Sequence, residues 1–201
     1  MTRTKRVIAT PVRHAARAEH VFRALSAQKA DFDEWHVWVN TSNSEELQRL
    51  RDLRSRAPGW VRLVEPDGSN PAGGDLNLYR FYASCADPGT CYARLSEDIA
   101  WLAPGFARTL FEFREAHPQY FLVHANVADS PVLSHVHDRL GVVRSGVGRP
   151  TADHEDPVAR HYEYSADVHA SLLDAIASGP QAVGDWTFAA WRLHSHERVH
   201  V

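Results

Sequence analysis

Short apolar runs alternate with longer amphipathic stretches over residues 6–127. The runs are rich in β-branched and aromatic residues and predict strands at RVIAT (6–10), WHVWVN (35–40), WVRLV (60–64), CYARL (91–95) and YFLVHANV (120–127). The stretches between them predict helices at 13–28, 42–55, 76–86 and 104–117. Strands that alternate with helices of this length favour a mainly parallel central sheet flanked by helices on both faces. The expected fold class is therefore α/β.

Turn and cap residues set the expected boundaries of these elements. Pro11 is expected to close the first strand. The N-cap candidates of the second helix are Thr41, Ser42, Asn43 and Ser44, of which Ser42 fits a capping box with Glu45. Pro104 suits the first turn of the fourth helix. After residue 127 the pattern weakens: we expect a long loop at 142–160 and a helix at 165–177 capped by Ser165. No linker is evident, which predicts one domain over 1–201.

The composition excludes several classes of function. With 25 acidic and 22 basic residues the net charge is −3, which argues against the broad basic surface that binding to a nucleic-acid backbone requires. The two cysteines, Cys85 and Cys91, are too few for a disulfide framework or a thiolate zinc site. No apolar run approaches the ~20 residues that span a bilayer, and the first residues lack the apolar part of a signal peptide. A cytoplasmic protein without a transmembrane segment is expected.

Carboxylates follow the fourth predicted strand, which is expected to be a buried, central strand of the sheet. Ser96, Glu97 and Asp98 come directly after it. In open α/β sheets ligands bind beyond the carboxyl ends of the strands, so these residues are candidates for a site. Glu97 and Asp98 could hold a divalent cation such as Mg²⁺ or Mn²⁺, which takes oxygen ligands. Alternatively, they supply negative charge to the start of a following helical turn.

Four segments together resemble a family of bacterial and viral glycosyltransferases of the GT-A type: the first strand with its Thr-Pro and Arg, EWHVWVN, YARLSEDI and FREAHPQYFLVHANV. The resemblance covers about residues 6–137, with a weaker echo in DWTFAAWRLHSHERVHV. It implies a GT-A-like fold and transfer of a sugar from a nucleotide-sugar donor to an acceptor. Family members carry an acidic triplet, in the manner of Asp-x-Asp, that binds a divalent metal and the donor diphosphate. Ser96 replaces the first acid of that triplet here.

The resemblance implies that the first half of the chain holds the nucleotide. Thr10 and Arg13 lie at the exit of the first strand, and Arg13 could meet a phosphate or the base, or simply begin a solvated helix. Asn40 lies at the exit of the second strand, where it could contact the ligand or cap the next helix. Arg94, inside its strand, would need a partner if buried: either a structural acid or the diphosphate.

Three later residues complete the candidate site. Asp129 follows the fifth strand and could act as a base toward the acceptor if the reaction inverts configuration, or could form a turn. His194 and His196 could supply a late histidine ligand to the metal, as the resemblance implies, or belong to a solvated end.

Two functions therefore stay open. In the first, the protein is a metal-assisted glycosyltransferase, in which a cation stabilises the charge that develops on the departing diphosphate. In the second, it is a catalytically degenerate GT-A-like domain that binds a sugar nucleotide or a protein partner without turnover. The replacement of the first acid by Ser96 is compatible with both.

Overall fold

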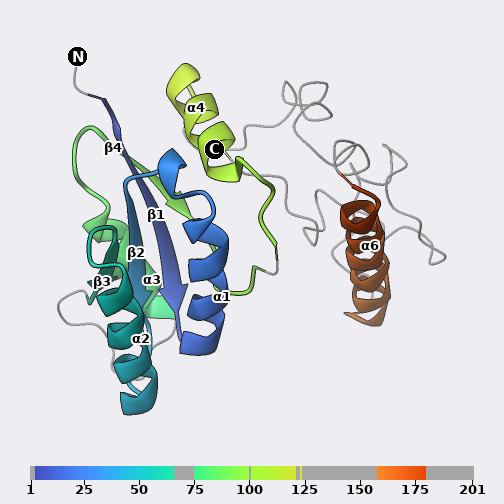
Figure 1. Cartoon of the computed structure of the whole chain (residues 1–201), viewed down its shortest axis with the longest axis horizontal. Coiled ribbons are helices and arrows are strands. Elements are labelled where there is room, and N and C mark those ends of the chain that lie inside the picture. Colours follow the sequence, from blue (N-terminus) through green and yellow to red (C-terminus); the bar gives the residue numbers. More distant parts are fainter. Residues whose placement is uncertain (1–2, 66–74, 100, 121–122, 124–157, 180–201) are drawn as a thin grey trace. The chain divides into compact units, whose positions relative to one another are not determined.

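A computed structural model of the chain describes residues 3–65, 75–99, 101–120, 123 and 158–179. The chain divides into two compact units, residues 1–118 and 119–201, and the expectation of one domain over 1–201 stays a prediction. In the first unit the elements are, in order, β1 (Lys5–Val12), α1 (Ala15–Ser26), the 3-10 turn η1 (Lys29–Asp31), β2 (Glu34–Val39), α2 (Ser44–Arg56), β3 (Val61–Val64), α3 (Asp75–Ser84), β4 (Thr90–Arg94) and α4 (Phe106–Ala116). The second contains α6 (Val158–Ser178) (Figure 1).

The described strands form one sheet in the order β3-β2-β1-β4, and every pair is parallel (Figure 1). The α/β class and four of the predicted strands are thereby confirmed, while the run at 120–127 lies largely outside the described residues. The residues of β4 are half-buried or exposed, so the expectation of a buried strand is wrong. Among the described strands β4 is the outermost on its side, and its expected central position stays a prediction because the 120–127 run lies largely outside the described residues.

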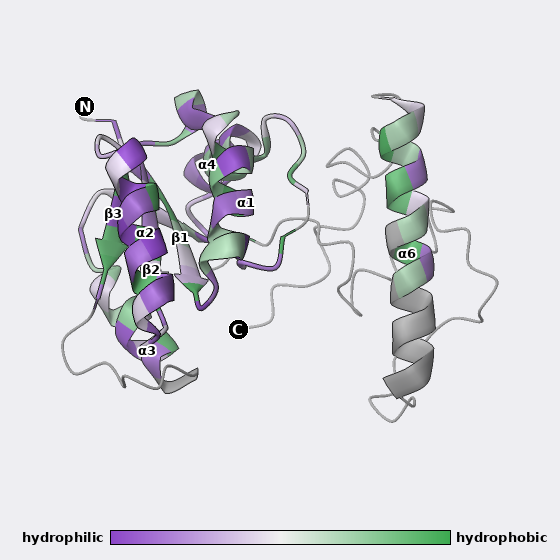
Figure 2. Ribbon diagram, turned by 60° about the horizontal axis from the view of Figure 1, so that its bottom comes forward, coloured by the Kyte–Doolittle hydropathy of each residue, from purple (hydrophilic) through white to green (hydrophobic). Residues whose placement is uncertain are grey.

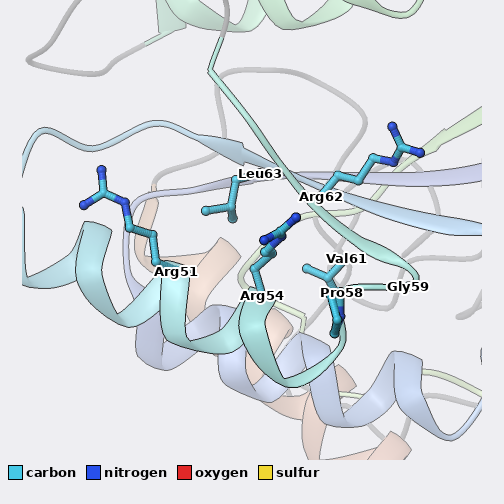
Figure 3. Close-up of a pocket in the computed structure, with 7 residues that line it drawn as sticks. All are labelled: Arg51, Arg54, Pro58, Gly59, Val61, Arg62 and Leu63. Atoms are coloured by element: carbon cyan, nitrogen blue, oxygen red, sulfur yellow. The ribbon is translucent and has the colours of Figure 1, made fainter.

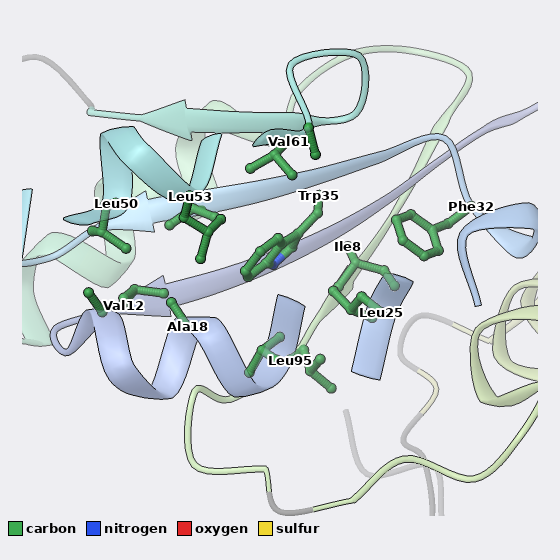
Figure 4. Close-up of a cluster of buried hydrophobic side chains, with 14 of the residues drawn as sticks. Ile8, Val12, Ala18, Leu25, Phe32, Trp35, Leu50, Leu53, Val61 and Leu95 are labelled. Atoms are coloured by element: carbon green, nitrogen blue, oxygen red, sulfur yellow. The ribbon is translucent and has the colours of Figure 1, made fainter. Parts of the chain in front are cut away.

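One face of the sheet carries the main core. Strand residues such as Ile8, Trp35 and Val61 point to the same side and pack against α1 and α2 through Leu25 and Leu50 (Figure 4). All five are at most 1% exposed. The outward side of α2 is mostly hydrophilic (Figure 2), which fits a helix that buries a single apolar stripe.

The opposite face is covered by α3 near the carboxyl ends of the strands. Trp38 of β2 stacks on Phe81 of α3, with ring centroids 5.0 Å apart and planes 2° from parallel. Tyr82 meets the same indole edge-on. Since neighbouring residues of a strand point to opposite faces, Trp35 and Trp38 anchor different helices on the two sides of β2.

The amino end of this second face is polar. Glu34, which is 8% exposed, receives three cationic or polar neighbours: Lys5 at 2.9 Å, His36 at 2.9 Å and Arg62 at 2.6 Å. Burial raises the pKa of the Glu34 carboxyl, but hydrogen bonds from His36 and Lys5 and the charge of Arg62 outweigh it, so the net pKa is lowered. These contacts connect β1, β2 and β3 at the amino end of the sheet.

β1 continues beyond the expected stop at Pro11, to Val12. Along β1, the backbone groups of successive residues point alternately toward β2 and toward β4. The Val12 carbonyl accepts from Asn40 on the β2 side, whereas the Ala9 carbonyl accepts from Leu95 on the β4 side at 2.8 Å. Pro11, two residues after Ala9, therefore faces the β4 side. Because proline has no N–H, the next bond of that ladder, to the carbonyl of Leu95, cannot form. Pro11 ends the pairing with β4 and leaves the pairing with β2 intact.

Helix starts also differ from the sequence expectations. α2 is capped by Asn43, whose side chain accepts from the N–H groups of Glu45 and Glu46, so the capping box at Ser42 is wrong. α4 begins after Gly105, which has a left-handed φ of 73°, so Pro104 precedes the helix. α6 begins at residue 158, within the expected loop and before the expected cap at residue 165. None of the helices in the described ranges combines the length and apolar character needed to cross a bilayer.

Candidate functional site at the carboxyl edge of the sheet

The order β3-β2-β1-β4 contains a topological switch between β1 and β4. From β1 the chain adds β2 and then β3 on one side, and returns to add β4 on the other. In doubly wound sheets, ligands bind outside the carboxyl ends of the two strands at such a point. The loops that follow β1 and β4 contain Arg13 and the triplet Ser96-Glu97-Asp98. The triplet that the sequence singled out thus lies at the switch.

The Glu97 side chain links these two loops by hydrogen bonds. It is buried, and its Oε2 accepts hydrogen bonds from the backbone N–H groups of Arg13 at 2.9 Å and His14 at 3.1 Å. His14 is the N-cap residue of α1 but makes no side-chain cap bond; Glu97, 83 residues away in the sequence, bonds instead to the N–H groups of His14 and of the residue before it. A carboxylate is favoured there by the helix dipole and by the free N–H groups.

A second carboxylate completes the same helix start. Glu46, in the first turn of α2, accepts from the N–H of Ala15. Three successive N–H groups, those of Arg13, His14 and Ala15, therefore bond to protein carboxylates. In nucleotide-binding sheets the start of this helix is where a phosphate binds. In this conformation Glu97 and Glu46 occupy that position themselves.

Asp98 is held differently from Glu97. Its side chain is 65% exposed and forms an ion pair with Arg17 of α1. The same guanidinium lies 3.8 Å from Oε1 of Glu97. Asp98 also donates its backbone N–H to the Ser96 hydroxyl at 3.3 Å, which folds the triplet into a turn. Asp98 is therefore the triplet carboxylate that solvent reaches.

Thr10 and Asn40 are buried, in contrast to what contact with a nucleotide would require in this conformation. Thr10 is 0% exposed and its Oγ1 accepts from the indole N–H of Trp35 at 2.9 Å. Asn40 is 4% exposed, and its Oδ1 accepts from the side-chain amide of Asn77 on α3 at 3.0 Å. Asn40 does not cap α2, so that alternative is wrong: it joins the end of β2 to α3.

The two predicted arginines lie on the surface. Arg13 is exposed at the β1–α1 turn, where its backbone bonds to Glu97. Arg94, the last residue of β4, is exposed as well, so the condition under which it would need a buried partner does not apply. Asp129, His194 and His196 lie outside the described residues.

Sequence reasoning missed the residues that support the site. Arg17, Glu46 and Asn77 each bond to or beside a predicted site residue across the fold. Of these three, only Glu46 could have been noticed in the sequence, because it is an acid in the first turn of a predicted helix. That position suggests a role at the start of α2, whereas the Glu46 carboxylate bonds at the start of α1.

One further buried donor lies beside this edge. Among the buried side-chain nitrogen and oxygen atoms of the described residues, Nε1 of Trp38 has no hydrogen-bond partner. A buried unpaired donor costs about 1–3 kcal/mol. Trp35, on the other face of the same strand, has its N–H satisfied by Thr10.

No group of three or more His, Cys, Asp or Glu side chains suited to a metal is present in the part of the chain that the structure describes. A divalent cation with one protein carboxylate is a common arrangement, because water and substrate phosphates fill the other positions of Mg²⁺.

Comparison with protein-family models, with curated proteins and with solved structures found no match to this chain.

Proposed function

We propose that the protein is a glycosyltransferase that binds a nucleotide-sugar donor at the carboxyl edge of its sheet, between the ends of β1 and β4. The supporting observation is that the topological switch of a parallel sheet coincides with the Ser96-Glu97-Asp98 triplet. The resemblance of residues 6–137 to GT-A enzymes supplies the reaction class. The acceptor is an unspecified hydroxyl-bearing compound.

The two carboxylates of the triplet have separate roles in this proposal. Glu97 is a positioning residue that fixes the β1–α1 turn through two backbone hydrogen bonds. Asp98 is the candidate ligand for Mn²⁺ or Mg²⁺, and it would exchange Arg17 for the cation. A cation bound there would neutralise charge on the departing diphosphate. Released from Asp98, Arg17 remains beside the site as a second positive charge for the phosphates.

The remaining assignments are proposals of the same kind. Arg13 and Arg94 are exposed arginines at the ends of β1 and β4, from which they could meet the donor. Thr10 and Asn40 would act by holding Trp35 and Asn77 in place. Asp129 as base and His194 or His196 as late metal ligands rest on the sequence alone.

A second candidate is a catalytically degenerate domain that binds a sugar nucleotide or a protein partner without turnover. The observation that favours it is the filled start of α1, where Glu97 and Glu46 bond to the N–H groups that a phosphate would use. A donor diphosphate would have to bind next to these carboxylates rather than in their place.

Calorimetry with nucleoside diphosphates, with and without Mn²⁺, tests the site. We expect Mn²⁺ to strengthen binding, Asp98→Asn to remove most of that gain, and Ser96→Asp to increase it by adding a ligand charge. Asp52→Asn is the matched control, since Asp52 is an exposed aspartate on α2 whose carboxylate accepts from Gln48. Equal affinity with and without Mn²⁺, in the native protein and in Asp98→Asn, would reject the metal site. Turnover of a panel of nucleotide-sugars would then separate the transferase from the degenerate domain.

A further inference from the structure

A pocket of about 500 Å³ lies between the last turns of α2 and strand β3, away from the carboxyl edge discussed above (Figure 3). Its floor is apolar, and its rim is cationic. The residues that line it are Arg51, Arg54, Pro58, Gly59, Val61, Arg62 and Leu63. Three arginines around one pocket are notable in a chain whose net charge is −3.

Two of these arginines have no carboxylate partner in the part of the chain that the structure describes. Within the described ranges, the side chains of Arg51 and Arg54 are exposed and form no hydrogen bond or ion pair. Arg62 bonds to Glu34 at 2.6 Å, yet its side chain stays 61% exposed. Asp52, between the first two in sequence, accepts from Gln48 at 2.9 Å and does not line the pocket. The pocket is therefore locally positive.

The pocket also borders an open strand edge. Among the described strands, β3 pairs only with β2. The carbonyl of Trp60 accepts from Trp35 at 2.7 Å, so by the alternation of a parallel ladder the backbone groups of Val61 and Leu63 face away from β2. The Val61 N–H bonds to the carbonyl of Ala57 at 3.0 Å. The Val61 carbonyl and both backbone groups of Leu63 remain on the outer edge.

The arginines are spread along this edge rather than gathered at one point. Figure 3 shows the guanidinium groups of Arg51 and Arg62 at opposite ends of the pocket, with that of Arg54 between them. A single phosphate needs donors that converge on it. Arg51 and Arg54 lie on α2, whereas Arg62, which bonds to Glu34, points to the other face of β3. Two neighbouring cations on one side suit a ligand with several carboxylates on one face of an extended chain, where side chains recur about every 7 Å.

We propose that an acidic peptide segment in extended conformation binds here as an additional strand. Its backbone bonds to the outward groups of Leu63 and Val61, and the carboxylates on its α2-facing side pair with Arg51 and Arg54. Strand addition supplies affinity through backbone bonds, whereas the arginines select acidic over neutral or basic sequences. The partner is thus identified by its chemistry: an exposed, extended, acidic stretch of another protein.

The test uses a fluorescein-labelled peptide of alternating Glu and Val, titrated with the full chain and followed by fluorescence anisotropy. We expect binding to the native protein, and binding about tenfold weaker to the Arg51→Gln/Arg54→Gln double variant. Arg49→Gln is the control, because Arg49 is exposed on the same helix but does not line the pocket. Its affinity should stay within about twofold of the native value.

Two altered peptides separate strand addition from charge attraction alone. The Gln-Val peptide removes the charges, and a Glu-Val peptide N-methylated at alternate residues removes backbone donors while it keeps the charges. Both should bind about tenfold more weakly than the parent. Absence of binding by the parent peptide would overturn the proposal, as would equal binding of the N-methylated peptide or an equal loss in Arg49→Gln. Tight binding of inorganic phosphate without binding of the peptide would overturn it in favour of a small-anion site.

Discussion

Replacement of Glu97 by Gln tests whether this buried carboxylate holds the β1–α1 turn together. Hydrogen bonds to a charged group contribute about 1.5–3 kcal/mol each, against about 0.5–1.5 kcal/mol for a neutral acceptor. Glu97→Gln keeps an acceptor oxygen for the N–H groups of Arg13 and His14 but removes the charge. The loss is therefore about 1 kcal/mol for each bond, and the helix dipole adds about 0.3–1 kcal/mol. We expect the free energy of unfolding to fall by about 2–3 kcal/mol.

Asp98→Asn is the matched comparison, since it makes the same chemical change at the adjacent residue. Asp98 is 65% exposed and its pair with Arg17 is open to solvent, so its removal should cost no more than about 1 kcal/mol. Urea unfolding followed by tryptophan fluorescence measures both values under identical conditions. If Asp98→Asn destabilises the protein as much as Glu97→Gln, the role assigned to Glu97 in fixing the turn is wrong.

Three further predictions follow from buried polar groups. Trp35→Phe should cost about 1–3 kcal/mol more than Trp38→Phe in urea unfolding, because only the N–H of Trp35 is bonded; equal losses would contradict this. Burial raises the pKa of the Cys85 thiol to about 11 from 9.0, so its alkylation at pH 8 should be about a hundredfold slower in the native than in the unfolded protein, measured by mass spectrometry. Similar native and unfolded rates would refute it. The pKa of Glu34 is lowered in the folded protein, so its ionised form stabilises the protein above pH 4.5, and that contribution is lost as the pH falls through the folded pKa. The difference in free energy of unfolding between the native protein and Glu34→Gln should therefore become smaller on acidification. A difference that grows would contradict this prediction.

The local pattern of the sequence was enough to predict most of the elements. The runs at 6–10, 35–40, 60–64 and 91–95 became β1 to β4 because each is a continuous apolar or alternating segment. Caps were less predictable: Asn43 and Ser42 are adjacent cap formers, and the choice depends on which one can turn its oxygen toward two N–H groups. The order of the strands was not predictable, since the apolar pattern of a strand does not determine which other strand it pairs with. The place of β4 next to β1 therefore comes from the structure alone.

The position of the candidate site was predictable, whereas the roles of its members were not. A strand exit that carries acids pointed to the triplet, and the fold places it at the switch between β1 and β4. The division of labour between Glu97 and Asp98 depends on partners 81–84 residues away, which no local window contains. Thr10 was singled out for its place at a strand end, but its partner, Trp35, comes from the next strand.

Pro11 has a consequence for how a ligand would enter between β1 and β4. The absence of its N–H ends the ladder next to Leu95, so the strand ends are already unpaired in the free protein. A ligand that binds there would break no backbone hydrogen bond between the two strands. Its binding free energy would therefore include no cost of separating β1 from β4. Pro11 thus preorganises this edge of the sheet. The missing hydrogen bond between β1 and β4 reduces the stability of the folded protein, and does not reduce the affinity for a ligand.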